Sequence, residues 1–227
     1  MRVGVVRFPG SNCDADAFHA IELAGAEAVY LWHEDADLAG SEAVILPGGF
    51  AFGDYLRAGV IARFSPVMRS VADAAAAGVP VLGICNGFQV LAEARLLPGA
   101  LLRNEELRFS SRWVRTRLES RATPFTAAIP EGAVLRMPVA HGEGRYFDEP
   151  ATLDQLEHGD RVVFRYLDNP NGSLRDIAGV RNERGNVVGL MPHPERADDP
   201  LLGSADGMLV FRSLVESAAR TRAGAAS

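Results

Sequence analysis

Apolar runs that read as buried strands alternate with helical segments through the first half of this chain. The runs occupy residues 3–7, 28–32, 43–46 and 79–82. Apolar residues at helical spacing follow the first run at about 14–23, the third at about 65–77, and the fourth from residue 85 to a stop at Leu97-Pro98-Gly99. Ser65 followed by Pro66 predicts a capped start for the second helix. This alternation predicts βαβ units and a parallel sheet.

The second half of the chain has a different pattern. Strand-like runs cover 112–119, 134–139 and 162–166, and runs at 177–181 and 187–191 predict a hairpin across residues 182–185. A last helix is predicted from about Ser204, with an Ala/Arg-rich tail after Arg220 that is expected to fray. With no repeat or linker, we expect residues 1–227 to form one α/β domain with an open, mostly parallel but mixed sheet and helices on both faces.

Composition excludes several classes of function. The formal charge is −6, and all 23 basic residues are scattered arginines, so nucleic acid is not an expected partner. The absence of lysine excludes a Walker-A lysine and a Schiff-base lysine. Two cysteines, Cys13 and Cys85, form neither a disulfide framework nor a CxxC metal pair, and no metal site is expected. No apolar stretch reaches membrane-spanning length, and we expect a soluble cytoplasmic protein without a membrane partner.

The segment Gly83-Ile84-Cys85-Asn86-Gly87 places a cysteine between a predicted strand and a predicted helix. A tight strand-to-helix turn needs glycine on both sides, because a Cβ two residues before or after the cysteine would collide with the packed strand or helix. The turn exposes the sulfur above the sheet, at a helix N-terminus that favours the thiolate. The pattern therefore predicts a nucleophile elbow at Cys85.

Two further segments end strands at the same predicted edge of the sheet. In Met191-Pro192-His193-Pro194-Glu195 the prolines favour extended geometry and are expected to exclude a helix. His193 and Glu195 are therefore expected side by side, with the carboxylate orienting the imidazole. After residues 43–46, Gly48-Gly49 offers backbone N–H groups that, with that of Asn86, predict an oxyanion hole. Gln89 lies one helical turn beyond Cys85 and is placed to meet a polar substrate.

The remaining candidates have simpler interpretations. A cysteine that ends a buried strand is often only a small hydrophobe, and a lone His-Pro-Glu or Gly-Gly is often only a turn. Cys13 competes as a nucleophile, but its setting, Ser11-Asn12-Cys13-Asp14, is typical of a helix cap. Structural or exposed roles are favoured for His19 and His158. His33 follows the second strand run, and a structural role is favoured there with an interface role left open.

Together these motifs resemble the class I (triad) glutamine amidotransferases over nearly the whole chain. The residues that carry this resemblance are Pro47-Gly48-Gly49, the segment 83–89 around Cys85, and His193-Pro194-Glu195. Four further segments resemble the branch of this family that serves purine synthesis: 8–14, 48–59, 140–145 and 202–207.

The resemblance implies a role for each site residue. Cys85 would attack the carboxamide of L-glutamine, His193 would act as general base and then general acid, and Glu195 would orient His193. The N–H groups of Gly49 and Asn86 would hold the oxyanion. Gln89 and the backbone around His141 and Gly142 would bind the substrate.

The resemblance also implies partners. Ammonia would pass to a separate synthetase subunit that carries ATP and Mg²⁺, with a small third subunit in the assembly and no cofactor in this chain. Two alternatives stay open: a class I amidotransferase subunit of another pathway, such as guanylate or histidine synthesis, and a catalytically idle assembly module. A stand-alone cysteine peptidase or redox sensor is disfavoured, because it leaves the segment 140–145 unexplained.

Overall fold

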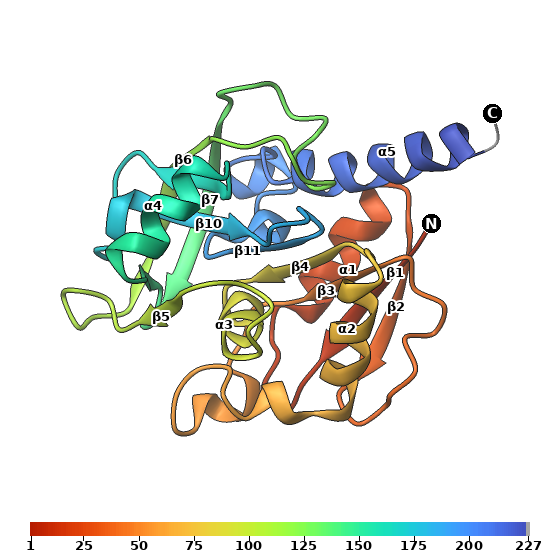
Figure 1. Cartoon of the computed structure of the whole chain (residues 1–227), viewed down its shortest axis with the longest axis horizontal. Helices are drawn as coiled ribbons and strands as arrows, with labels where there is room; N and C mark the ends of the chain where they lie inside the picture. The colour runs from red at the N-terminus through yellow and green to blue at the C-terminus, as the bar shows by residue number, and fades with distance from the viewer. Residues whose placement is uncertain (226–227) are drawn as a thin grey trace.

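A computed structural model describes residues 1–225, and these form a mixed sheet with helices packed around it (Figure 1). The strands are β1 (Arg2–Arg7), β2 (Glu27–Trp32), β3 (Ala43–Leu46), β4 (Val81–Ile84), β5 (Ala100–Leu102), β6 (Ser110–Leu118), β7 (Val134–His141), β8 (Arg145–Phe147), β9 (Val162–Tyr166), β10 (Ile177–Arg181) and β11 (Val187–Leu190). The α-helices are α1 (Asp14–Leu23), α2 (Pro66–Ala76), α3 (Asn86–Glu93), α4 (Pro150–His158) and α5 (Met208–Ala225). Short 3-10 turns are η1 (Ala51–Asp54), η2 (Ala62–Phe64), η3 (Leu174–Asp176), η4 (Pro194–Arg196) and η5 (Pro200–Leu202).

Nine of the strands within residues 1–225 form one sheet in the order β2-β1-β3-β4-β11-β10-β9-β6-β7. The first five are parallel neighbours, and the last four extend the sheet with antiparallel pairings. This arrangement confirms the predicted parallel half, the predicted change of character in the second half, and the β10–β11 hairpin. It also makes β3, β4 and β11 adjacent parallel strands, so the segments that follow them leave the sheet at one edge.

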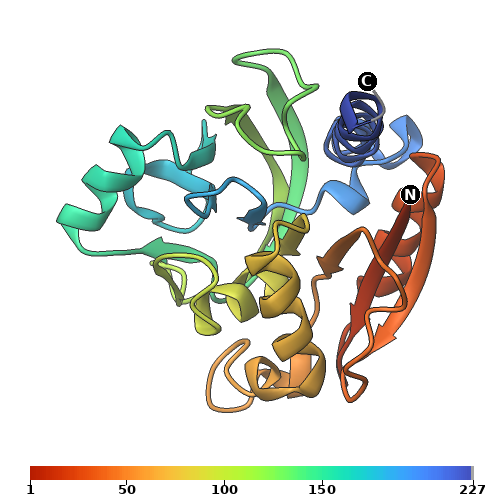
Figure 2. The same cartoon turned by 45° about the vertical axis from the view of Figure 1, so that its right-hand side comes forward.

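The helices cover both faces of the sheet, as predicted. Helix α1 connects β1 to β2, and helix α2 connects β3 to β4. These two connections run in opposite directions along the sheet. Because such crossovers are right-handed, α1 and α2 lie on opposite faces. Helix α5 contacts α1 and therefore shares its face, while α3 packs on β3, β4 and β11 (Figure 2).

The core runs along the whole sheet, from the parallel strands to β6, β7 and β9, beneath the helices. Strands β3, β4 and β11 are buried along their whole length, which fits their continuous apolar sequences. Phe88 of α3 packs so closely on Gly189 of β11 that an added Cβ there would lie 2.1 Å from its ring. Burial of such a phenylalanine contributes about 1.5–3 kcal/mol. This contact seats α3, and with it Cys85, against the centre of the sheet.

Two predicted helix ends differ from the structure. Ser65 precedes α2 and Pro66 begins it, but the Ser65 side chain makes no capping hydrogen bond. The reason is that the N–H of Val67, which it would satisfy, already donates to the carbonyl of His33 at 3.1 Å. Helix α3 ends at Glu93 rather than near Leu97, because Arg95 turns the chain with a left-handed φ of 59°.

The C-terminal prediction was also partly wrong. Helix α5 begins at Met208 instead of about Ser204, because Ser204 pairs with Asp199 in a β-bridge. The helix continues to Ala225, so the tail after Arg220 does not fray within the described residues; residues 226–227 lie outside them. An ion pair between Arg222 and Glu42 fixes its last turns beside the start of β1. Strands β5 and β8 and helix α4 were not predicted.

Candidate active site

Cys85 lies on a strained turn between β4 and α3. Its backbone has φ 49° and ψ −103°, a left-handed conformation that non-glycine residues seldom adopt. An added Cβ on Gly83 would lie 2.7 Å from the backbone of Gly87, and one on Gly87 would lie 1.9 Å from the carbonyl oxygen of Leu46. Both distances are impossible contacts, which confirms the reason given above for the two glycines. The turn thus holds Cys85 in a conformation that only a tightly packed frame could impose.

The thiol of Cys85 faces a cavity of about 220 Å³. Although only 5% of the residue is exposed, it lines this cavity at the N-terminus of α3, where the helix dipole favours a negative sulfur. Its Sγ lies 3.8 Å from the carbonyl oxygen of Ala140. The full lining is Gly49, Phe50, Asp54, Cys85, Gln89, Phe109, Ala140, His141, Gly142 and Glu143. The cavity therefore brings most of the predicted site residues to one place.

His193 and Glu195 form a buried pair just beyond β11. The Nδ1 atom of His193 lies 2.6 Å from Oε1 of Glu195, and the side chains are 2% and 0% exposed. The prolines did not exclude a helix here: Pro194 begins the 3-10 turn η4, because a proline suits the first position of a helix. His193, the residue before that proline, is extended as predicted, with φ −102° and ψ 92°. The turn still places the two side chains together.

The other ring nitrogen of His193 is directed away from Glu195. This Nε2 atom is buried and has no hydrogen-bond partner among the described residues. Burial by itself lowers the pKa of His193, but the charges of Glu195 and Cys85 outweigh it and raise that pKa well above its ordinary value. Cys85 is thus an electrostatic neighbour of the imidazole, and the site favours an imidazolium that can give a proton.

The two predicted oxyanion donors belong to segments that are linked to each other. Gly49 has a φ of 150°, and an added Cβ would lie 2.8–2.9 Å from backbone atoms of Ser11 and Asn12, so only glycine fits. The Asn86 side chain accepts a hydrogen bond from the N–H of Ala51 at 3.0 Å. This bond ties the start of α3 to the loop that carries Gly49. Asn86 does not line the cavity, and its side chain is bonded to Ala51, Asp54 and Gln89; the role of its backbone N–H stays a prediction.

Gln89 and His141 have different surroundings. Gln89 lines the cavity, and its Nε2 donates to the carbonyl oxygen of Glu143 at 2.5 Å. Burial lowers the pKa of His141 to about 4, so the ring is neutral at neutral pH. Its Nδ1 lies 3.1 Å from Oδ1 of Asn104, which also accepts from the N–H of Gly144 at 3.0 Å. The His141 ring therefore holds the 141–144 loop in shape.

Three residues near the cavity were missed in the sequence. Asp54 lines the cavity, and burial together with the neighbouring charge of Glu143 raises its pKa to about 6. Tyr166 is fully buried with an unpartnered hydroxyl, and burial together with the charge of Cys85 raises its pKa well above its usual range. Phe109 borders the cavity and is 55% exposed. Asp54 belongs to the segment 48–59 named above, where no feature marks it as a site residue, whereas Tyr166 and Phe109 stand in no motif.

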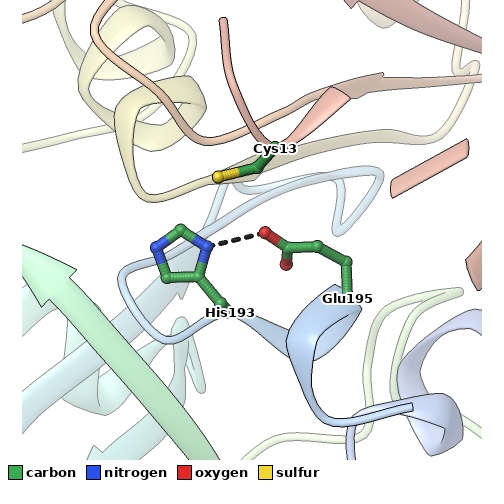
Figure 3. Close-up of side chains that lie close together, drawn as sticks. All are labelled: Cys13, His193 and Glu195. Carbon is green, nitrogen blue, oxygen red and sulfur yellow. Dashed lines mark hydrogen bonds and ion pairs between the residues drawn. The ribbon is translucent and has the colours of Figure 1, made fainter. Parts of the chain in front are cut away.

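The position of the Cys13 side chain was also not predicted. It is the N-cap residue of α1, as its setting predicted, but its side chain makes no capping hydrogen bond. Instead its Sγ points toward His193 and Glu195, and the ligand atoms of the three residues lie within 4.8 Å of one another (Figure 3). These three residues are called here the Cys13 cluster. Cys13 is about 180 residues away from the other two in the sequence, so no spacing could have indicated that it joins them. His33 is buried beside Phe52 and does not line the cavity.

Comparisons with known proteins agree with this geometry. The family model of the CobB/CobQ-like glutamine amidotransferase domain matches residues 1–205. The chain is 66% identical, over 96% of its length and 99% of the relative's, to the phosphoribosylformylglycinamidine synthase subunit PurQ of Rubrobacter xylanophilus.

Solved structures are similar as well. One is a chain of the PurLQS structure from Thermotoga maritima, with a TM-score of 0.87, 48% identity, and coverage of 95% of this chain and 97% of that one. A putative GMP synthase subunit from Thermoplasma acidophilum has a TM-score of 0.65 at 15% identity, covers 100% of this chain and 98% of its own, and shows a shared fold only. No helix within residues 1–225 is long and apolar enough to cross a membrane.

Proposed function

This chain belongs to the class I glutamine amidotransferases, in the CobB/CobQ-like family, and from that premise we propose that it is the glutaminase subunit of a phosphoribosylformylglycinamidine synthase. It hydrolyses L-glutamine and supplies the ammonia for an ATP-dependent carbon–nitrogen ligase complex of purine synthesis. The observation that carries this function is the 66% identity to a subunit of that enzyme over 96% of the chain. The elbow cysteine and the buried His–Glu pair supply the chemistry.

Cys85, His193 and Glu195 would act in sequence as a triad. The Cys85 sulfur forms a bond to the carboxamide carbon of glutamine, and the resulting oxyanion is held by the N–H groups of Gly49 and Asn86. His193 then donates its proton to the nitrogen, the carbon–nitrogen bond breaks, and ammonia leaves a glutamyl thioester. Water, deprotonated by His193, cleaves the thioester to glutamate and restores the thiol. Loss of one oxyanion donor is expected to cost about 3 kcal/mol.

Substrate binding would use the rest of the cavity. Gln89 and the backbone at His141 and Gly142 line it beside Cys85 and offer polar groups to the amino acid part of glutamine. The neutral His141 ring supports this loop and does not take part in proton transfer. We treat residues 1–227 as a single amidotransferase domain.

The amidation itself would take place on a partner. Ammonia that escapes to water at neutral pH is protonated and no longer a nucleophile, so it must pass directly to a synthetase subunit. We propose that this subunit binds ATP and Mg²⁺ and converts formylglycinamide ribonucleotide to its amidine, that a small third subunit completes the assembly, and that the complex is cytoplasmic. The PurLQS chain at 48% identity supports such an assembly. No observation favours a guanylate or histidine pathway, because the GMP synthase resemblance extends only to the fold.

The test separates ammonia production from ammonia use. In the complex with its synthetase, Cys85→Ala is expected to abolish amidation with glutamine while amidation with added ammonium salt continues at the unmodified rate. Cys13→Ser is the matched control, because it changes the only other cysteine and is expected to retain both activities. Glutamine-dependent activity in Cys85→Ala, or loss of both activities in an assembled complex, would refute the proposal.

A further inference from the structure

The Cys13 cluster combines three kinds of metal-binding group in a buried position. Cys13, His193 and Glu195 are each 2% exposed, and one ligand atom from each lies within 4.8 Å of the others. Cys13 comes from the start of α1, and the other two come from the segment after β11 (Figure 3). The triad chemistry proposed above gives no role to the Cys13 thiol. The Cys13 thiol donates a hydrogen bond to Oδ1 of Asn12 at 3.2 Å, and its sulfur also lies beside the histidine and the carboxylate, a placement that the triad chemistry does not explain.

Sulfur, imidazole nitrogen and carboxylate oxygen are the ligands that Zn²⁺ binds in proteins. With bond lengths of about 2.0–2.3 Å and tetrahedral angles, such ligand atoms lie about 3.3–3.7 Å apart around the ion. The atoms of the Cys13 cluster would need to shift by little more than about 1 Å to reach that spacing. Glu195 has an oxygen to spare, because its Oε2 is buried without a hydrogen-bond partner.

A second cleft borders one member of the cluster, Glu195, from another side. A cleft of about 500 Å³ reaches Glu195, and its lining is Ala15, Asp16, His19, Glu195, Arg196, Asp198 and Leu202. It shares no residue with the cavity that contains Cys85 and Gln89. Asp198 also carries a buried oxygen without a partner. This cleft gives a cation a route toward Glu195 that does not pass through the glutamine cavity; Arg196 also lines it and is paired with Asp16 at 3.1 Å.

We propose that Cys13, His193 and Glu195 form an inhibitory Zn²⁺ site behind the catalytic histidine. The ion would bind the Cys13 sulfur, Nδ1 of His193 and a Glu195 oxygen, and would release to solvent both the Cys13 thiol proton and the hydrogen now shared between Nδ1 and Oε1. An imidazole that carries a dication on Nδ1 is a poor proton acceptor at Nε2, and Glu195 would no longer orient it. Hydrolysis of glutamine would stop while the glutamine cavity stays open.

Inhibition by this route differs from metal capture by the nucleophile. An ion bound between Cys85 and His193 would occupy the glutamine cavity and compete with the substrate. An ion in the Cys13 cluster enters from the other cleft, so inhibition is expected to lower kcat with little change in KM. The inhibitory consequence rests on the proposed function of His193, whereas binding of the metal to the cluster does not.

The first experiment therefore measures binding without activity. Co²⁺ is titrated into the full chain, and the near-ultraviolet absorption of a cobalt–thiolate bond is recorded in two matched variants. Cys85→Ser is expected to bind one Co²⁺ with this absorption, and Cys13→Ser is expected to lack it. Absorption that is retained in Cys13→Ser, or absent in Cys85→Ser, would overturn the proposal. Cys13→Ala, with thermal melting of every variant, repeats the test if the serine variant does not fold.

The second experiment measures inhibition of the assembled complex by Zn²⁺. Cys13→Ser is expected to keep the metal-free rate and to need at least about tenfold more Zn²⁺ for half inhibition. Loss of a residue that only supports a metal ligand lowers metal affinity at least about tenfold, and loss of the ligand itself should lower it at least as much. Equal sensitivity in the variant and the unmodified chain would overturn the inhibitory role. A complex that hydrolyses no glutamine even without metal would refute the proposed function instead, and the cobalt spectrum would still report on the site.

Discussion

Gly48 is the position where a single methyl group should separate catalysis from folding. An added Cβ there would lie 2.6 Å from Cε1 of His193 and 3.1 Å from Sγ of Cys13. Gly48 has no left-handed φ, so alanine fits the backbone at this position. The substitution Gly48→Ala therefore acts on the catalytic histidine through one steric contact.

The size of the effect follows from the distances. Carbon atoms rest at about 3.6 Å from one another, so the His193 ring must retreat by about 1 Å. The ring is buried, and its Nδ1 is hydrogen-bonded to Glu195 at 2.6 Å. Movement of the ring therefore disturbs that hydrogen bond and the alignment of Nε2 with Cys85. A misplacement of about 1 Å in a catalytic group costs on the order of 100-fold in rate, or about 2.7 kcal/mol. The same clash is expected to lower the free energy of unfolding by about 1–3 kcal/mol.

The assay compares glutamine and ammonium as nitrogen sources for the complex. We expect kcat with glutamine to fall on the order of 100-fold in Gly48→Ala. KM should change little because Gly48 does not line the glutamine cavity. Amidation with ammonium should be unchanged, which controls for assembly, and a melting curve controls for folding. A folded variant with an unchanged kcat for glutamine would refute the claim that the position of His193 limits the reaction.

Two further predictions concern the frame of the site. Gly87→Ala would place a Cβ 1.9 Å from the Leu46 carbonyl oxygen and is expected to prevent folding, which would be measured as loss of a cooperative unfolding transition. The control Gly142→Ala makes only a 3.8 Å contact with Phe109 and should keep the cooperative transition. Because the pKa of Asp54 is raised from 3.8 to about 6, its carboxyl group stays protonated in the folded chain between these pH values, whereas the unfolded chain loses the proton. The unmodified chain should therefore lose stability relative to Asp54→Asn as the pH rises through that window, and a constant difference in urea midpoints would contradict this.

The elbow and the parallel character of the first half of the sheet could be predicted because both depend on local patterns in the sequence. Gly83 and Gly87 indicate a turn with no room for a Cβ at either position. Alternating strands and helices permit few topologies. The edge at which Cys85 and His193 meet follows from that topology without knowledge of side-chain packing.

The remaining features depend on contacts between distant segments. The Ser65 side chain does not cap α2, because the N–H of Val67 donates to the carbonyl of His33 instead. The pKa of Asp54 depends on burial beside Glu143, and Cys13 meets His193 only after the sheet has formed. Each of these outcomes is set by a partner more than thirty residues away in the chain, which residue spacing does not encode.

The central claim is that the sulfur of Cys85 becomes covalently bonded to the substrate. The complex is mixed with glutamine, quenched in acid during turnover, digested and analysed by mass spectrometry. The account predicts a glutamyl group on the peptide that contains Cys85 and an unmodified peptide that contains Cys13. A glutamyl group on Cys13, or ammonia release with no adduct on Cys85 under conditions that preserve thioesters, would contradict it.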